Sequence, residues 1–160
     1  MILNQHYWKV LAIVLGIGVG ISCKKNTTTV PQNVQNNCTV QRATSLLVNI
    51  NVLSGSAQFF PISGIGGFTY IPSSQGGLSG IIVYRESQSQ FIALERNCTK
   101  DGCANSKALV WIMTGNVQCK DSICGSVFNV IDGSVQTGPA NIPLYQYKTT
   151  WDGTNLHIYN

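Results

Sequence analysis

The sequence predicts an all-β domain over residues 45–160, and two observations support this. Short apolar runs, several of them alternating with polar residues, recur between turns rich in Gly and Pro, as is typical of β-sandwiches and open barrels. No stretch of this region repeats its apolar residues with the period of an amphipathic helix. The length suffices for one hydrophobic core. We therefore expect an antiparallel β-sandwich or open barrel.

The predicted strands follow one another along the chain. Residues 46–52 alternate apolar and polar side chains, which indicates a half-buried strand. Further strands are predicted at residues 67–71, 80–84, 91–94, 108–113, 126–131, 145–150 and 156–159. The polar residues 85–90 suit a hairpin connection, and Asp132-Gly133 suits a tight turn because glycine accepts a positive φ angle.

The residues before the domain predict export and lipid anchoring. The apolar run 10–21 is too short to span a bilayer and ends at Cys23, in a pattern that resembles a bacterial lipobox, with Gly20 where that motif usually has Leu. We expect residues 1–22 to be a lipoprotein signal peptide and Cys23 to be acylated. An uncleaved signal anchor is the alternative. Either way the domain belongs outside the cytoplasm, at the bacterial cell envelope, facing the periplasm or the cell surface.

Residues 23–44 are rich in Asn, Gln and Thr and hold few bulky apolar side chains, so we expect a polar tether between the lipid and the domain. Cys38 lies in this tether without an evident partner. The net charge is only +4, and the basic residues of the domain are scattered along the sequence. This charge pattern gives no reason to expect nucleic-acid binding. The expected partner is the membrane, through the lipid anchor, and the sequence names no protein partner.

Four of the six cysteines occupy two loops with the same C-x4-C spacing. The first loop holds Cys98 and Cys103, and the second holds Cys119 and Cys124. Short runs that follow the second loop are Gly125-Ser126, Phe128, Gly138-Pro139-Ala140 and Pro143-Leu144.

This arrangement resembles the Rieske domain. In that family, loops of the form C-x-H-x-G-C and C-x-C-H-G-S-x-F hold a 2Fe-2S cluster with two Cys and two His, and a G-P-A-x-x-P-L loop covers it. The resemblance covers about half of the chain, residues 80–160, and implies a small cysteine-loop subdomain at about residues 97–144. It also implies that Gly125, Ser126, Gly138 and Pro139 are remnants of a cluster pocket.

The ligand histidines of the family are missing. Lys100 stands where the first would lie, and Cys124 directly precedes Gly125-Ser126, the place of the second. The chain has two histidines, of which His6 lies in the predicted signal and His157 near the C-terminus. A cluster held by two cysteines and two histidines therefore lacks its ligands.

Three chemistries remain open for the four loop cysteines. Disulfides are favoured, because an exported domain meets an oxidising compartment and the leader has no twin arginine for export of a folded cluster protein. The resemblance implies the pairs Cys98–Cys119 and Cys103–Cys124, with bonds inside each loop as the alternative. A 2Fe-2S cluster held by all four thiolates and a structural zinc site are the other two chemistries.

We expect a disulfide-stabilised structural or binding module rather than an enzyme, with no catalytic residues and no cofactor. No Ser-His-Asp set is available, and the C-x-x-C spacing of a thiol-disulfide oxidoreductase is absent. The acids in the cysteine loops, Asp101 and Asp121, are expected to be solvated. The alternative function is Rieske-type electron transfer, as an oxidoreductase component, with the 2Fe-2S cluster on Cys98, Cys103, Cys119 and Cys124.

Overall fold

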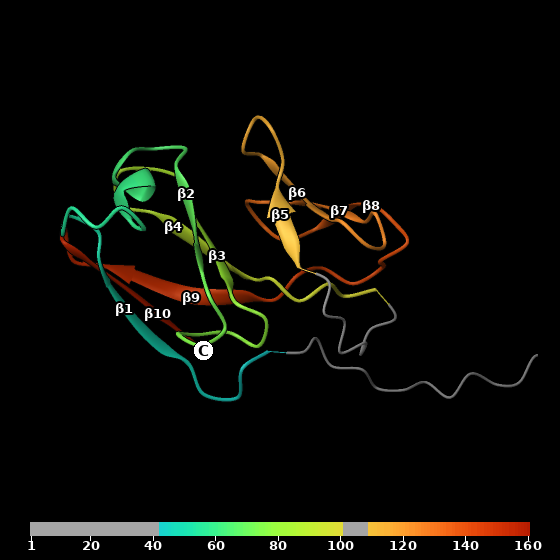
Figure 1. Ribbon diagram of the computed structural model, residues 1–160, viewed down its shortest axis with the longest axis horizontal. Coiled ribbons are helices and arrows are strands. Elements are labelled where there is room, and N and C mark those ends of the chain that lie inside the picture. Colours follow the sequence, from blue (N-terminus) through green and yellow to red (C-terminus); the bar gives the residue numbers. More distant parts are fainter. Residues whose placement is uncertain (1–41, 101–108) are drawn as a thin grey trace, which may run out of the picture. The chain divides into compact units, whose positions relative to one another are not determined.

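A computed structural model describes residues 42–100 and 109–160, which form two antiparallel sheets (Figure 1). The predicted signal peptide, most of the predicted tether, Cys103 and Asp101 lie outside these residues. The elements in chain order are β1 (Leu47–Asn51), η1 (Phe60–Ser63), β2 (Phe68–Ile71), β3 (Ile81–Arg85), β4 (Phe91–Glu95), β5 (Val110–Ile112), β6 (Gln118–Asp121), β7 (Val127–Asn129), β8 (Val135–Thr137), β9 (Gln146–Trp151) and β10 (Asn155–Tyr159).

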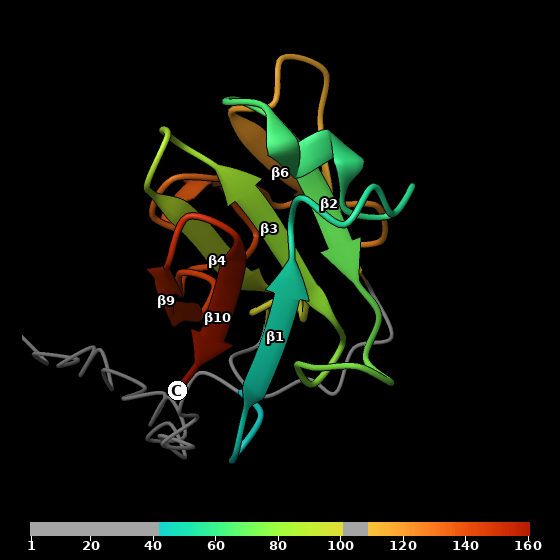
Figure 2. The same ribbon diagram turned by 90° about the vertical axis from the view of Figure 1, so that its left-hand side faces the viewer.

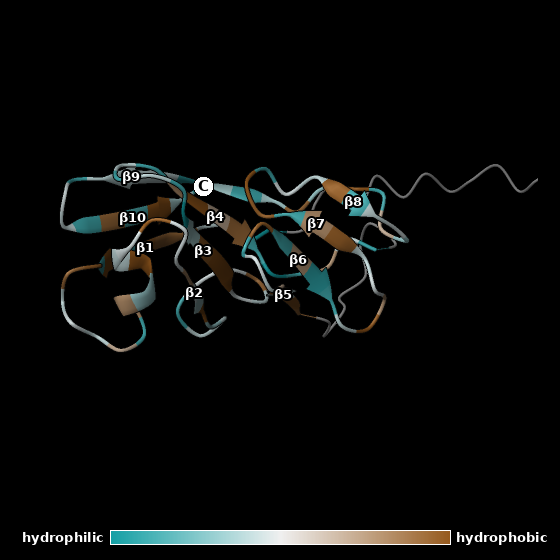
Figure 3. Ribbon diagram, turned by 90° about the horizontal axis from the view of Figure 1, so that it is seen from above, coloured by the Kyte–Doolittle hydropathy of each residue, from teal (hydrophilic) through white to brown (hydrophobic). Residues whose placement is uncertain are grey.

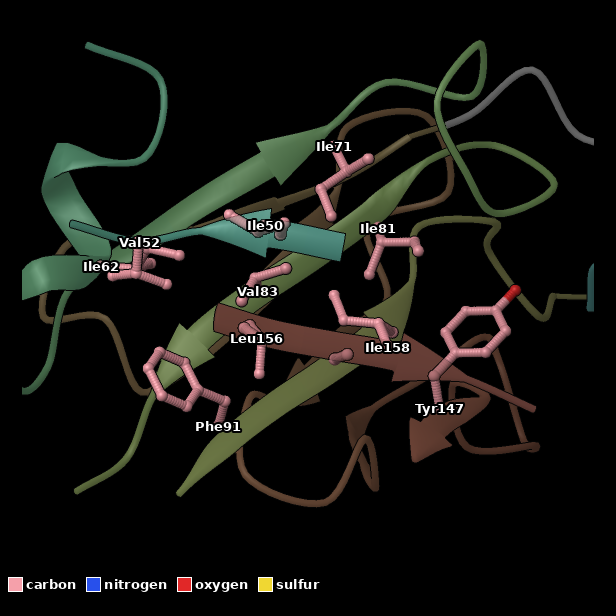
Figure 4. Close-up of a cluster of buried hydrophobic side chains, with 11 residues drawn as sticks. Ile50, Val52, Ile62, Ile71, Ile81, Val83, Phe91, Tyr147, Leu156 and Ile158 are labelled. Atoms are coloured by element: carbon pink, nitrogen blue, oxygen red, sulfur yellow. The ribbon is translucent and has the colours of Figure 1, made fainter. Parts of the chain in front are cut away.

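The larger sheet joins the first and last strands of the domain. Its order is β1-β10-β9-β4-β3-β2, and every neighbouring pair is antiparallel. Figure 2 shows β1 beside β10. Ile50 of edge strand β1 and Ile71 of the opposite edge strand β2 belong to the same buried cluster. The sheet therefore curls around this first core, whose side chains are drawn in Figure 4.

Strands β3 and β4 separate two cores. Side chains alternate between the faces of a strand, and here Val83 and Ala93 enter the first core, whereas Ile82 and Leu94 enter a second one. All five residues of β4 are buried, and Figure 3 shows both strands in the brown of apolar residues. These continuous apolar runs form the wall on which the smaller sheet packs.

The smaller sheet has the order β5-β6-β7-β8 and covers the second core. Phe128 and Val130 pack there with Leu94 and Leu144. A polar contact also joins the two sheets, because the Ile112 N–H of β5 donates to the Tyr70 hydroxyl of β2 at 2.9 Å.

Arg96, immediately after β4, reinforces this junction. Its guanidinium carbon lies 4.3 Å from the ring centre of Tyr70 and 4.2 Å from that of Trp111, within the range of cation–π attraction. The side chain is buried, and its Nε donates to the Val110 carbonyl at 3.2 Å. These contacts hold β5 against Arg96, which lies two residues before Cys98 of the first cysteine loop.

The all-β class is confirmed, and each predicted strand overlaps an observed one. Strands β6 and β8 were not predicted, and η1 is a single short turn of 3-10 helix. Within the segment predicted to be tether, the Arg42 guanidinium donates to the Tyr145 hydroxyl at 2.5 Å. The described residues contain no helix long and apolar enough to cross a membrane.

Candidate metal centre

Three side chains from the two cysteine loops converge beside the second core. Cys98 follows β4, Asp121 ends β6, and Cys124 lies in the turn between β6 and β7. One ligand atom from each, the two sulfurs and a carboxylate oxygen, lie within 4.8 Å of one another. The Cys98 and Cys124 sulfurs are 3.4 Å apart. We call these three residues the Cys-Asp-Cys cluster.

The turn after β6 positions two of its members. Asp121 Oδ1 accepts the N–H groups of Ile123 at 2.6 Å and Cys124 at 3.0 Å, which holds the turn closed. Gly125 donates its N–H to the Asp121 carbonyl at 3.0 Å and has a φ of 78°. A side chain at this position would strain the backbone. The turn therefore needs both the carboxylate and the glycine.

Backbone donors face both sulfurs of the cluster. The Lys100 N–H donates to Cys98 Sγ at 3.5 Å, and the Ser126 N–H donates to Cys124 Sγ at 3.4 Å. The Ser126 hydroxyl lies 3.0 Å from Cys124 Sγ and accepts the Ala140 N–H at 2.9 Å, so its own proton is available to the sulfur. Each sulfur thus has at least one hydrogen-bond donor directed at it.

A third loop ties the two cysteine loops together. Ala140, in the loop that begins with the cis peptide Gly138-Pro139, is bound by Ser126 of the second cysteine loop. Two residues later, the Ile142 carbonyl accepts the hydroxyl of Thr99, from the first cysteine loop. The predicted pocket residues Ser126, Gly138 and Pro139 therefore belong to segments that meet around the cluster.

Asp121 is fully buried, which corrects the expectation of a solvated loop acid. Alternation along β6 places Cys119 and Asp121 on the buried face and leaves Gln118 and Lys120 exposed. Its Oδ2 atom has no hydrogen-bond partner among the described residues. The alternating sequence at residues 118–121 was the available signal, although a polar strand this short is easily taken for a loop.

The charges in the cluster follow from this burial. Burial alone would raise the pKa of Asp121, but the thiol of Cys98 and the amides of Cys124 and Ile123 outweigh it, and the net pKa is below its usual value. The pKa of the Cys98 thiol is raised, mainly by burial and to a smaller extent by the facing Asp121 carboxylate. Within the cluster, the Asp121 carboxylate therefore faces a Cys98 thiol that holds its proton more tightly than usual.

Cys119 lies apart from this group. It is buried in the second core, paired across the sheet with Ile112 and Phe128, and burial raises the pKa of its thiol to about 12. The described cysteines are all thiols. The structure brings the Cys98 sulfur to that of Cys124 rather than to that of Cys119. Cys103, like Cys23 and Cys38, lies outside the described residues, and the two predicted disulfides, Cys98–Cys119 and Cys103–Cys124, stay predictions.

The described donors do not fit a Rieske-type cluster. No histidine described here belongs to the group, since His157 lies in β10 with its Nδ1 2.6 Å from Asn49 Oδ1, and His6 lies outside the described residues. Ligation by four thiolates would need Cys119, which the convergent group lacks. A two-iron cluster needs two separated pairs of donors, whereas these three atoms crowd around one point.

No profile of a known protein family matches this chain, and no curated protein matches it. Among solved structures, the ferredoxin of carbazole 1,9a-dioxygenase from Nocardioides aromaticivorans IC177 is 15% identical with a TM-score of 0.45, over 72% of this chain and 97% of that one. A protein described as an NADH-dependent nitrite reductase small subunit from Mycobacterium tuberculosis is 14% identical with a TM-score of 0.42, over 74% and 97%. These values are too low to assign a family.

Proposed function

We propose that this chain is a lipid-anchored module of the bacterial cell envelope that has a Rieske-like fold without the family's cluster, and that it works by binding rather than by electron transfer. The observation that carries the proposal is the composition of the site. Two cysteines and an aspartate converge where the sequence resemblance expects cluster ligands, and no described histidine joins them.

The architecture around the site supports the Rieske-like part of this proposal. Two loops carrying cysteines and a third loop containing Gly138-Pro139-Ala140 meet through Ser126 and Thr99. The resemblance assigns these loops the roles of holding and covering a cofactor. Their hydrogen bonds explain how the arrangement persists in a chain that lacks the ligand histidines.

The proposal includes a covalent link between the cysteine loops under oxidising conditions. A disulfide has an S–S distance of about 2.05 Å, and the Cys98 and Cys124 sulfurs lie 3.4 Å apart. A small movement of the turn at residues 122–125 would close this gap. Export and acylation at Cys23 remain supported by the sequence pattern alone.

Iron and acid-labile sulfide measured on anaerobically purified protein test this function. A colourless, iron-free protein is the expected result. Visible absorption bands with stoichiometric iron and sulfide would overturn the proposal and establish the alternative, Rieske-type electron transfer with altered ligation.

A further inference from the structure

We infer that Cys98, Asp121 and Cys124 bind one thiophilic divalent cation of the zinc type when the two cysteines are reduced. The ion is held by the two sulfurs and one carboxylate oxygen. This inference names a ligand for the site of the proposed function, and it rests on that function only in requiring that no 2Fe-2S cluster occupies these residues.

The first support is distance. In a tetrahedral zinc site with Zn–S bonds of about 2.3 Å, two sulfurs stand about 3.8 Å apart. The Cys98 and Cys124 sulfurs are 3.4 Å apart, and the carboxylate oxygen lies within 4.8 Å of both. One ion between the three atoms needs an adjustment of only a few tenths of an ångström between the sulfurs, whereas a disulfide needs a larger one.

The second support is the unpaired oxygen of Asp121. Its Oδ1 already accepts two amide N–H groups, which fixes the orientation of the carboxylate. Its Oδ2 is buried without a hydrogen-bond partner among the described residues. An unpaired buried polar atom is costly. A cation at the cluster would supply the missing partner and balance the negative charge.

The third support is the environment of the sulfurs. Metal-bound cysteines are thiolates, and hydrogen bonds to their sulfurs stabilise and orient them. The Lys100 N–H faces Cys98 Sγ, and both the N–H and the hydroxyl of Ser126 face Cys124 Sγ. Donors of this kind are therefore already in place on both sulfur ligands.

The ligand set selects the class of ion. Thiolates disfavour Ca²⁺ and Mg²⁺, which prefer oxygen ligands, whereas sulfur combined with a carboxylate oxygen suits Zn²⁺. Binding replaces two S–H bonds with two metal–sulfur bonds and releases two protons to solvent, with no change of oxidation state. Three protein ligands leave a fourth position for water or another donor.

Cobalt binding tests the inference directly. The full chain, purified in detergent and kept anaerobic with a phosphine reductant, is titrated with Co²⁺ and then with Zn²⁺. We expect one equivalent of Co²⁺ to produce sulfur-to-metal charge-transfer bands and the intense visible bands of tetrahedral cobalt, and we expect Zn²⁺ to displace it. Absence of these bands, or of stoichiometric zinc, overturns the inference.

Variants locate the site. Cys98→Ser, Cys124→Ser and Asp121→Asn should each weaken Zn²⁺ affinity by at least about 10–100-fold, the loss usual for outer-shell partners alone. Asp121→Asn retains Oδ1 as an acceptor for the turn, which keeps this variant folded. The matched control is Cys119→Ala, two residues from Asp121 in the same strand and outside the convergent group, which should bind as the parent does. Affinity unchanged in Asp121→Asn and Cys98→Ser would overturn the inference.

A thermal measurement covers variants that fold poorly. At zinc concentrations above the dissociation constant, Zn²⁺ should raise the melting temperature of the parent and of Cys119→Ala with the logarithm of its concentration, and at the same concentration it should raise that of Asp121→Asn less. Two failures remain distinguishable. Iron with labile sulfide would overturn the proposed function and this inference together, whereas a protein that binds no metal of any kind overturns this inference alone.

Discussion

Cys98 Sγ lies 3.4 Å from Cys124 Sγ, although 26 residues separate them in the sequence. This contact joins the two cysteine loops, and it predicts the product of oxidation. Without metal, oxidised protein should link Cys98 to Cys124 and gain about 3.5 kcal/mol in the free energy of unfolding, from the chain-entropy estimate for a loop of this length. Peptide mapping under non-reducing conditions identifies the partner. A Cys98 peptide linked to Cys103 or Cys119 would contradict the geometry, and Zn²⁺ added beforehand should slow the oxidation.

Gly125 provides a prediction about the second cysteine loop. Its φ is 78°, and an added Cβ would have open space around it, so Gly125→Ala costs only backbone strain, about 1–2 kcal/mol. Gly55, with a φ of 70° and equally open space, is the matched control. Urea unfolding should show similar losses of stability in both variants. Weaker Co²⁺ binding should appear only in Gly125→Ala, and equal binding in the two would show that this turn does not position the ligands.

Much of the fold could be predicted from residue pattern, because the strands of the larger sheet are apolar or alternate. The run at residues 91–94 is buried on both faces, and its bulky β-formers mark it as a strand. Strands β6 and β8 were missed since Gln118–Asp121 and Val135–Thr137 are short and carry mostly polar residues. Such strands form because neighbouring strands pair with them, which local sequence does not report.

The candidate site was only partly predictable, for a related reason. The cysteines and the 138–140 loop were identified from the motifs, and the structure brings Cys98, Cys124 and Ala140 into one region. Asp121 was overlooked because its burial depends on the pairing of β6 with β5 and β7. Which sulfur faces Cys98 likewise depends on the turn after Asp121, and C-x4-C spacing carries no information about it.

Lipid anchoring makes a prediction that is independent of the site. Cys23→Ser should abolish incorporation of radiolabelled fatty acid and move the protein from the detergent phase to the aqueous phase, because the acyl chains supply the membrane affinity. Cys38→Ser serves as the control, since this cysteine lies in the predicted tether. Labelling that persists in Cys23→Ser would refute the lipoprotein assignment.

Asp152 should make stability depend on pH in the acid range. Its carboxylate accepts the N–H groups of Thr154 and Asn155 and the Asn155 side-chain amide, and these bonds lower its pKa from 3.8 to about 2. A lowered pKa means that the stabilisation is present above the unfolded-state value and is lost as pH falls toward the folded-state value. Asp152→Ala should therefore be less stable than the parent at pH 7, and the difference should shrink between pH 4 and 2. A difference that stays constant over this range would argue against the mechanism.

The last prediction concerns the buried pair of Tyr147 and Glu95. The Tyr147 hydroxyl donates to Glu95 Oε2 at 2.7 Å, and the Leu78 and Ser79 N–H groups donate to the two carboxylate oxygens at 2.6 and 2.8 Å. This carboxylate ties the 72–80 loop to β4, immediately before the first cysteine loop.

Tyr147→Phe preserves the ring and removes the hydrogen bond to the buried Glu95 carboxylate, together with the one that the hydroxyl accepts from the Ala43 N–H at 3.2 Å. It should therefore lower the free energy of unfolding by about 1.5–3 kcal/mol. Thr149→Val, which removes a neutral hydroxyl bond to the Phe91 carbonyl from the same strand, should cost about 1 kcal/mol and serves as the matched control. Urea unfolding measures both losses of stability, with one slope of unfolding free energy against urea concentration used for the parent and the two variants. Co²⁺ spectra of Tyr147→Phe should match those of the parent, because the Cys-Asp-Cys cluster is held by the turn at residues 121–126 rather than by Glu95. An altered spectrum would indicate that the larger sheet positions Cys98 through the Tyr147–Glu95 pair.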